Sequence, residues 1–250
     1  MQGEQLIFNL HQQKAGGKTV ESALERKLRQ RVVRVSKVMP DLVEGDISKY
    51  AGAISSQPSL VPLQTKVVTG HFYYGLHEVI DRPYIYTTII REPVSRLKSY
   101  YNYVMNGAED YFLRRYFIEH DIDFAAFAKL GDDVHPVDCP SELAIIADNG
   151  QTRLIHGAPR PLGHRTKQSE FDAVMAHLED DFAIVCPVSR ASEFVVQILK
   201  LAETRPPAFF PRVNTQETDW VGAIEPALSS YLKERPEFDG ALHTSAKRRF

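Results

Sequence analysis

The chain has 250 residues, of which 43% are hydrophobic and 10% aromatic, so it can bury a sizeable core within one domain. Its formal net charge of -2 and its pI of about 6.5 argue against a surface that coats nucleic acid. No long apolar run and no leader-like segment precedes the first predicted strand, so we expect no membrane span. Cys139 and Cys186 lack metal-site spacing and are expected to be reduced thiols.

The first predicted unit is a strand, a polar turn and a helix. Leu6–Leu10 is a short apolar run typical of a buried strand. The helix that follows has an apolar face with a 3.6-residue period, made of Val20, Ala23, Leu24 and Leu28. The side chains that we expect to point away from this face are Glu21, Glu25, Arg26 and Arg29.

The turn between this strand and helix predicts an anion site. It contains Lys14, Ala15, Gly16, Gly17, Lys18 and Thr19. The first backbone N–H groups of a helix have no partner within the helix, and paired glycines let a ligand approach them closely. Two lysines and a hydroxyl add positive charge and donors, so the expected ligand is a phosphate.

The rest of the chain alternates strands with helices. Further strands are predicted at Val32–Val35, Lys66–Gly70, Tyr84–Ile90 and Phe182–Cys186, and helices at Tyr111–Glu119, Phe124–Lys129, Ser141–Ile155, Phe171–Leu178 and Ser192–Leu201. Residues 37–64 are less regular and are expected to form a lid or to contain a short helix at Ile47–Ile54. The alternation predicts an α/β fold with a central, mainly parallel sheet flanked by helices, in a single domain over residues 1–250.

A second informative pattern, REPVSRLKSYY, occupies residues 91–101 after the strand that is apolar on both faces. Arg91 therefore falls at the carboxyl end of a strand, where open α/β sheets bind ligands. Pro93 suits the first turn of a helix, whose apolar stripe leaves Ser99 on another face. An arginine fork and a serine hydroxyl could clamp a phosphate, although an arginine paired to a carboxylate and a solvated serine fit the same residues.

The two patterns together resemble the PAPS-dependent sulfotransferases, in the branch of the heparan sulfate O-sulfotransferases and their bacterial relatives. That branch has a phosphosulfate loop of the form F-x-H-x-P-K-T-G-G-T-S, and this chain has Phe8, His11, Lys14, Ala15, Gly16, Gly17, Lys18 and Thr19. Gln13 replaces the usual proline, and Lys18 replaces the usual threonine. Arg91 and Ser99 match the second signature, R-[DE]-P-x-x-R-x-x-S. Looser matches are Thr69–His71 with Tyr74–His77, Asn149–Arg153, and Phe182–Cys186 with Ser189 and Arg190.

This resemblance implies a P-loop-like three-layer fold. It also implies transfer of a sulfuryl group from PAPS (3′-phosphoadenosine 5′-phosphosulfate) to an acceptor hydroxyl, with PAP (3′-phosphoadenosine 5′-phosphate) as the product. It implies that Arg91 and Ser99 hold the 3′-phosphate, that residues 14–19 hold the phosphosulfate, and that no metal is needed. The branch favours a saccharide acceptor. The Golgi members of this branch carry a membrane anchor, whereas we expect no membrane span in this chain. We therefore expect it to be a cytoplasmic, bacterial relative.

Sulfuryl transfer needs a cation near the leaving oxygen and a base near the acceptor. Lys14 is the expected cation. His71 is the expected base, because it follows a strand parallel to the loop strand and because the resembled branch has a histidine there. His11 is expected to tie the loop down, and His77 is a second candidate for the base.

Two other functions remain open. Gly17-Lys18-Thr19 matches the end of a Walker A motif, which would suggest a P-loop NTPase or small-molecule kinase. However, Gln12 stands where that motif has its first glycine, and none of the predicted strands ends in an acidic residue that could bind magnesium. A non-catalytic nucleotide-binding module, which has kept the loop and lost its base, is the other alternative.

Overall fold

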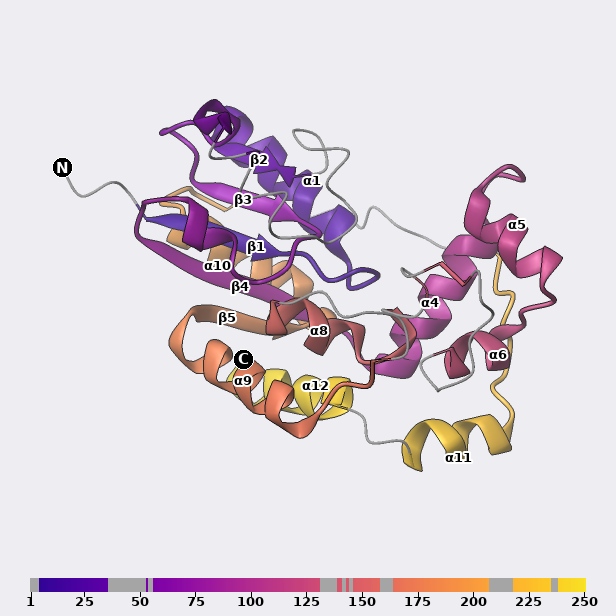
Figure 1. The fold of residues 1–250 in the computed structure, drawn as a ribbon. Helices are drawn as coiled ribbons and strands as arrows, with labels where there is room; N and C mark the ends of the chain where they lie inside the picture. The colour runs from indigo at the N-terminus through magenta and orange to yellow at the C-terminus, as the bar shows by residue number, and fades with distance from the viewer. Residues whose placement is uncertain are drawn as a thin grey trace.

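The computed structural model describes residues 5–35, 53, 56–130, 139–140, 143, 146–157, 164–206, 218–234 and 238–250. Its centre is a five-stranded sheet in the order β2-β3-β1-β4-β5, in which every neighbouring pair is parallel (Figure 1). The strands are β1 (Leu6–Leu10), β2 (Val32–Arg34), β3 (Val67–Gly70), β4 (Tyr84–Ile90) and β5 (Phe182–Pro187).

Helices cover both faces of this sheet and extend beyond one end of it. They are α1 (Gly17–Leu28), α4 (Pro93–Met105), α5 (Phe112–Glu119), α6 (Phe124–Lys129), α8 (Gly150–His156), α9 (Gln168–Asp180), α10 (Ala191–Leu201), α11 (Pro226–Glu234) and α12 (Phe238–Arg249). The molecule is therefore an α/β protein with the sheet as the middle layer (Figure 1).

Successive side chains of a strand point to opposite faces of the sheet, so each face packs against a different set of helices. Ile7 and Val67 point into a core cluster completed by α1 and α10. Phe8 and Val68, each one residue further on, point into the opposite cluster, to which α9 and α12 contribute. Both faces are buried, which explains why β4 is an almost unbroken run of β-branched and aromatic residues.

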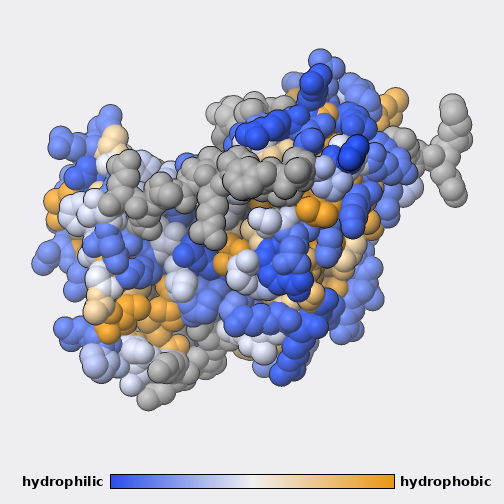
Figure 2. All heavy atoms as spheres, turned by 180° about the vertical axis from the view of Figure 1, so that it is seen from behind, coloured by the Kyte–Doolittle hydropathy of each residue, from blue (hydrophilic) through white to orange (hydrophobic). Residues whose placement is uncertain are grey.

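A third core cluster lies beyond the carboxyl ends of the strands. It joins α4, α5, α6 and α11 into a lobe at the end of the sheet to which the strand arrows point (Figure 1). Stacked rings hold it together, with Tyr101 against Phe117 at 5.3 Å and Tyr100 against Phe127 at 5.8 Å between centroids. Seen from behind, this lobe carries an apolar patch beside hydrophilic side chains (Figure 2).

The predicted strands are confirmed, with β1 and β4 at the predicted bounds and the others within one residue of them. The predicted helix Ser141–Ile155 is wrong as a continuous element. Asn149 has a left-handed backbone (φ 49°, ψ 43°), and α8 begins only after it. Asparagine tolerates this conformation better than most residues. The predicted helix at Ile47–Ile54 lies outside the described residues, apart from Ala53.

Cys139 and Cys186 are both buried and form no disulfide. Burial raises the pKa of the Cys186 thiol to about 12, so this sulfur stays protonated at neutral pH. Among the helices that the structure describes, none combines the length and the apolar character needed to cross a bilayer.

Candidate active site

The register of the sheet brings the ends of three strands together. Leu10, the last residue of β1, pairs with Gly70 of β3 on one side and with Thr88 of β4 on the other. The chain segments that leave these strands begin with His11, with His71 and, three residues beyond the end of the pairing between β1 and β4, with Arg91. All predicted site residues therefore belong to segments that start at the carboxyl ends of these strands, or to α1 and α4, which follow two of these segments.

The loop after β1 has the backbone of a tight turn. Lys14 has a φ of 63° and Gly16 a φ of 82°, so two left-handed residues turn the chain into α1. A left-handed lysine is uncommon and fits a functional turn. The backbone N–H groups of Gly17 and Lys18 donate to no residue that the structure describes. They are the open first-turn donors that an anion needs.

Gly17 has a steric role as well. A Cβ atom at this position would lie only 1.3 Å from Nε2 of His11, so the imidazole occupies the space of a side chain. Only glycine is compatible with this packing. His11 thus ties the loop to the start of α1, as the sequence predicted.

Three cations gather around this turn. The Lys14 ammonium lies 4.3 Å from the ring centroid of Tyr103 on α4, and the Lys18 ammonium lies 5.8 Å from it. Nη1 of Arg91 donates to the backbone carbonyl of Lys14 at 2.9 Å. Burial, with the nearby charges of Lys18 and Arg91, lowers the pKa of Lys14 to about 8. No carboxylate within the described ranges forms an ion pair with any of the three cations.

Ser99 is one helical turn before Tyr103 on α4, so the two side chains lie on the same helix face. Because the Tyr103 ring contacts Lys14, this face of α4 is turned toward the loop. Ser99 therefore lies on the side of α4 that is turned toward the loop. Glu92 forms the N-cap of α4 and accepts from the N–H groups of Val94 and Ser95 at 3.0 and 2.7 Å.

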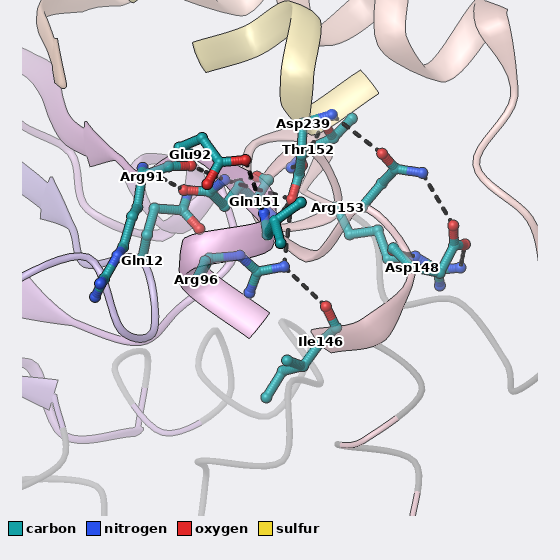
Figure 3. Close-up of polar contacts among 12 residues, drawn as sticks. Gln12, Arg91, Glu92, Arg96, Ile146, Asp148, Gln151, Thr152, Arg153 and Asp239 are labelled. Carbon is teal, nitrogen blue, oxygen red and sulfur yellow. Dashed lines mark hydrogen bonds and ion pairs between the residues drawn. The ribbon is translucent and has the colours of Figure 1, made fainter. Parts of the chain in front are cut away.

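The backbone of Arg91 is held by a side-chain amide from α8. Oε1 of Gln151 accepts from the N–H of Arg91 at 2.8 Å, and Nε2 of Gln151 donates to its carbonyl at 2.9 Å. The side chain of Arg91 extends away from this contact (Figure 3). Gln151 belongs to the looser match at Asn149–Arg153, and the sequence alone assigned it no role. Gln12, at the Walker-like position, is buried and donates to the Gln151 carbonyl at 3.4 Å.

His71 lies against His11, with ring centroids 4.3 Å apart. Its Nδ1 is 2.7 Å from the backbone carbonyl of His11. A carbonyl only accepts, so Nδ1 carries the proton and Nε2 holds the lone pair. Burial, followed by the charge of His11, lowers the pKa of His71 to about 3. The imidazole of His71 is therefore neutral at neutral pH.

Glu21 corrects another expectation, because it does not point to solvent. Its side chain is only 5% exposed and accepts from Nδ1 of His11 at 3.2 Å and from Arg34 at 2.8 Å. Burial alone would raise the pKa of Glu21, but the hydrogen bond and charge of His11, with Arg34, hold it below its usual value. The helical period located the apolar face correctly, but it could not show that Arg34 of β2 reaches this side of α1.

His77, the second candidate for the base, lies far from the loop. It stacks on Tyr84 with 4.0 Å between centroids, and Nδ1 contacts the Tyr86 hydroxyl at 3.0 Å. Tyr84 is the first residue of β4 and pairs with Leu6, the first residue of β1. The structure thus puts His77 at the amino end of the sheet, opposite the end from which the loop leaves. Among the described residues, no group of three or more His, Cys, Asp or Glu side chains could hold a metal ion.

No protein-family model matches this chain, and no curated protein matches it. Among solved structures, the chain is similar to a sulfotransferase from Alicyclobacillus acidocaldarius, with 13% sequence identity and a TM-score of 0.49. The similarity covers 96% of this chain and 94% of that chain.

Proposed function

We propose that this protein is a sulfotransferase that moves a sulfuryl group from PAPS to the hydroxyl of a saccharide. One observation carries the proposal. Lys14, Lys18 and Arg91 converge on a turn with open backbone N–H groups, and no ion-paired carboxylate within the described chain neutralises them. Such a cluster is suited to a ligand with several phosphate-like groups.

The two ends of the donor have separate partners in this proposal. The 5′-phosphosulfate lies on the N-terminus of α1, where Gly17 and Lys18 offer N–H groups and Thr19 a hydroxyl. The 3′-phosphate binds to Arg91 and Ser99. This division is supported by the position of Arg91 beside the loop, by the face of α4 on which Ser99 lies, and by the eight-residue spacing between them.

The transfer step is a displacement at sulfur. The acceptor oxygen forms a bond to sulfur while the bond from sulfur to the bridging phosphate oxygen breaks, and that oxygen leaves with PAP. Negative charge therefore grows on the phosphate side, where the Lys14 ammonium stabilises it. With a pKa of about 8, Lys14 is mainly protonated at neutral pH.

His71 takes the proton of the acceptor hydroxyl at Nε2. Its Nδ1–H bond to the His11 carbonyl fixes the tautomer that leaves Nε2 available. The low pKa keeps the imidazole neutral before the reaction, so this group is always ready to accept a proton. The same low pKa makes it a weak base, so the proton moves late in the formation of the bond to sulfur, when the acceptor oxygen has become more acidic.

One specific observation argues against an NTPase or kinase function. Glu92, the first carboxylate after β4, has both of its oxygens engaged by backbone N–H groups of α4. It is therefore occupied as a helix cap, where the alternative needs a magnesium-binding acidic residue.

The function is tested by thermal shift with PAP, ATP with and without magnesium, and NAD, followed by labelled PAPS with a panel of saccharides. We expect PAP alone to stabilise the protein and a sulfated saccharide to form. Stabilisation by magnesium-ATP without any response to PAP would contradict the donor. PAP binding without any sulfated product would favour the non-catalytic module.

A further inference from the structure

Asp239, in the first turn of α12, is a buried carboxylate that no sequence pattern singled out. It is 1% exposed. Oδ1 accepts from the N–H and the hydroxyl of Thr152 at 2.7 and 2.8 Å. Oδ2 accepts from the N–H of Gln151 at 3.1 Å, from its side-chain amide at 3.4 Å and from Nη2 of Arg96 at 3.3 Å.

These contacts make the starts of two helices cap each other. Asp239 satisfies the N–H groups of Gln151 and Thr152 in the first turn of α8. In return, Oδ1 of Asn149, just before α8, accepts from the N–H of Asp239 at 3.0 Å. The left-handed backbone of Asn149 is part of this exchange. The start of α8 is thus fixed by a residue that lies far along the chain, beyond β5, α10 and α11.

The same network reaches the candidate site through Gln151. Its amide nitrogen has two protons, of which one goes to the Arg91 carbonyl and the other to Asp239 (Figure 3). Its amide oxygen accepts from the Arg91 N–H. With both amide atoms engaged, the side chain of Gln151 has one orientation, and this orientation locates the backbone of Arg91.

Arg96 supplies the compensating charge. It is 3% exposed, and its Nη2 donates to the Ile146 carbonyl at 2.8 Å and to Asp239. A buried carboxylate without a cation would be costly, and so would this arginine without Asp239. Arg96 is the second arginine of the REPVSR sequence. One arginine of that motif is therefore committed to the fold, and the other, Arg91, has its side chain available at the loop.

We propose that Asp239 is a positioning residue for the donor site, which acts through Gln151 to fix Arg91 where it binds the 3′-phosphate. Only the identity of the ligand in this inference rests on the proposed function. The coupling from Asp239 to Arg91 is a property of the free protein and is tested without any ligand.

The first measurement is amide hydrogen exchange at Arg91 in the nucleotide-free protein. Asp239→Asn keeps the shape and replaces an acceptor oxygen by a donor, so we expect faster exchange at Arg91. The matched control is Leu242→Ala, which weakens the same helix in the hydrophobic core without touching Gln151. Exchange at Arg91 that is unchanged in Asp239→Asn, or equally accelerated in Leu242→Ala, would overturn the proposal.

The second measurement compares the Kd values of AMP and PAP, which differ by the 3′-phosphate. In Asp239→Asn we expect the preference for PAP over AMP to fall by about 10-fold, and in Leu242→Ala to stay at the wild-type value. A purely structural role would weaken both nucleotides alike and leave the ratio unchanged, which would overturn the proposal.

If Asp239→Asn does not fold, Gln151→Met gives the decision. This change removes both amide bonds to Arg91 and leaves the backbone bond to Asp239. Faster exchange at Arg91 with a reduced PAP preference would support the coupling, and wild-type values would overturn it. A wild-type protein with no preference for PAP would instead contradict the proposed donor, while the exchange data would still decide the coupling.

Discussion

His71 donates from Nδ1 to the backbone carbonyl of His11 across 2.7 Å, so one peptide group at the end of β1 sets the tautomer of the proposed base. The contact joins the segments that leave two adjacent strands. We expect His71→Ala to lower kcat by about 10²–10⁴-fold and to leave the Kd for PAP nearly unchanged. Steady-state kinetics and PAP titration check this, with His77→Ala as the control that should keep its rate. A loss of kcat of this size in His77→Ala would contradict the assignment of His71 as the base.

The low pKa of His71 also predicts a pH effect on stability. The unfolded chain binds a proton at this histidine near pH 6.5, whereas the folded protein does so only near pH 3. Between these values the unfolded state holds more protons, so the free energy of unfolding falls as the pH falls from about 6.5 toward 3. In urea denaturation, we expect the free energy of unfolding of His71→Gln to fall less steeply over this pH range than that of the wild type. An identical slope in both proteins would be inconsistent with the lowered pKa.

Lys14 should affect chemistry more than binding. We expect Lys14→Ala to reduce turnover by a larger factor than it raises the Kd for PAP, because its charge is needed most when the bridging oxygen becomes anionic. With a pKa of about 8, Lys14 is charged below and neutral above that pH, so kcat/KM should decline above about pH 8. Lys14→Arg should move this decline to higher pH. Equal losses of turnover and affinity would leave Lys14 as a phosphate anchor only.

Tyr103 should hold the Lys14 ammonium in place through its ring face. We expect Tyr103→Ala to lower kcat by about 2–5-fold, the size of an exposed cation–π contact, and Tyr103→Phe to retain the wild-type rate. Kinetics of the two variants side by side test this. A loss in Tyr103→Phe equal to that in Tyr103→Ala would assign the effect to the hydroxyl.

Arg91→Ala should weaken PAP binding by about 10–100-fold, as expected for the loss of charge-assisted hydrogen bonds, and Ser99→Ala by less. Calorimetric titration measures both. Arg115→Ala is the matched control, because Arg115 is an exposed arginine of α5 that pairs with Glu119. Wild-type affinity in Arg91→Ala would exclude Arg91 from the donor site.

Gly17→Ala should disrupt the loop, because its new methyl group would occupy the position of the His11 ring. We expect a lower Tm and weaker PAP binding than in the wild type. In the double variant with His11→Ala the clash is absent, so the two changes should be strongly non-additive. Simple additivity would mean that His11 does not pack on Gly17.

The strands, the sheet type and the tight turn before α1 were predictable from the sequence because each depends on local patterns. An apolar run such as Tyr84–Ile90 and the Gly16-Gly17 pair carry their own signals. Arg91 and Ser99 were predicted as phosphate ligands from a motif of fixed spacing, and this stays a prediction. The break at Asn149 was missed although the Asn149-Gly150 pair is a common turn signal, and the contact of Asn149 with the N–H of Asp239 is remote in sequence.

Buried polar contacts between distant segments escaped prediction for the same reason. A helical period assigns a face to Glu21, but the partner that draws this carboxylate inward, Arg34, arrives from β2. The pKa of His71 depends on how closely His11 and the surrounding chain enclose it, which residue type and spacing do not encode. Tyr103 carried no signal, because an aromatic residue on a helix is usually part of the core.

The mutual capping of α8 and α12 has a consequence for synthesis on the ribosome. The loop and its neighbouring strands are all made by the time Arg91 is added, but the carboxylate that orients Gln151 appears only at position 239. A nascent chain can therefore pair β1, β3 and β4 early, while the contacts of α8 wait until α12 has been synthesised. Nucleotide binding should thus appear abruptly, and late, as the chain lengthens.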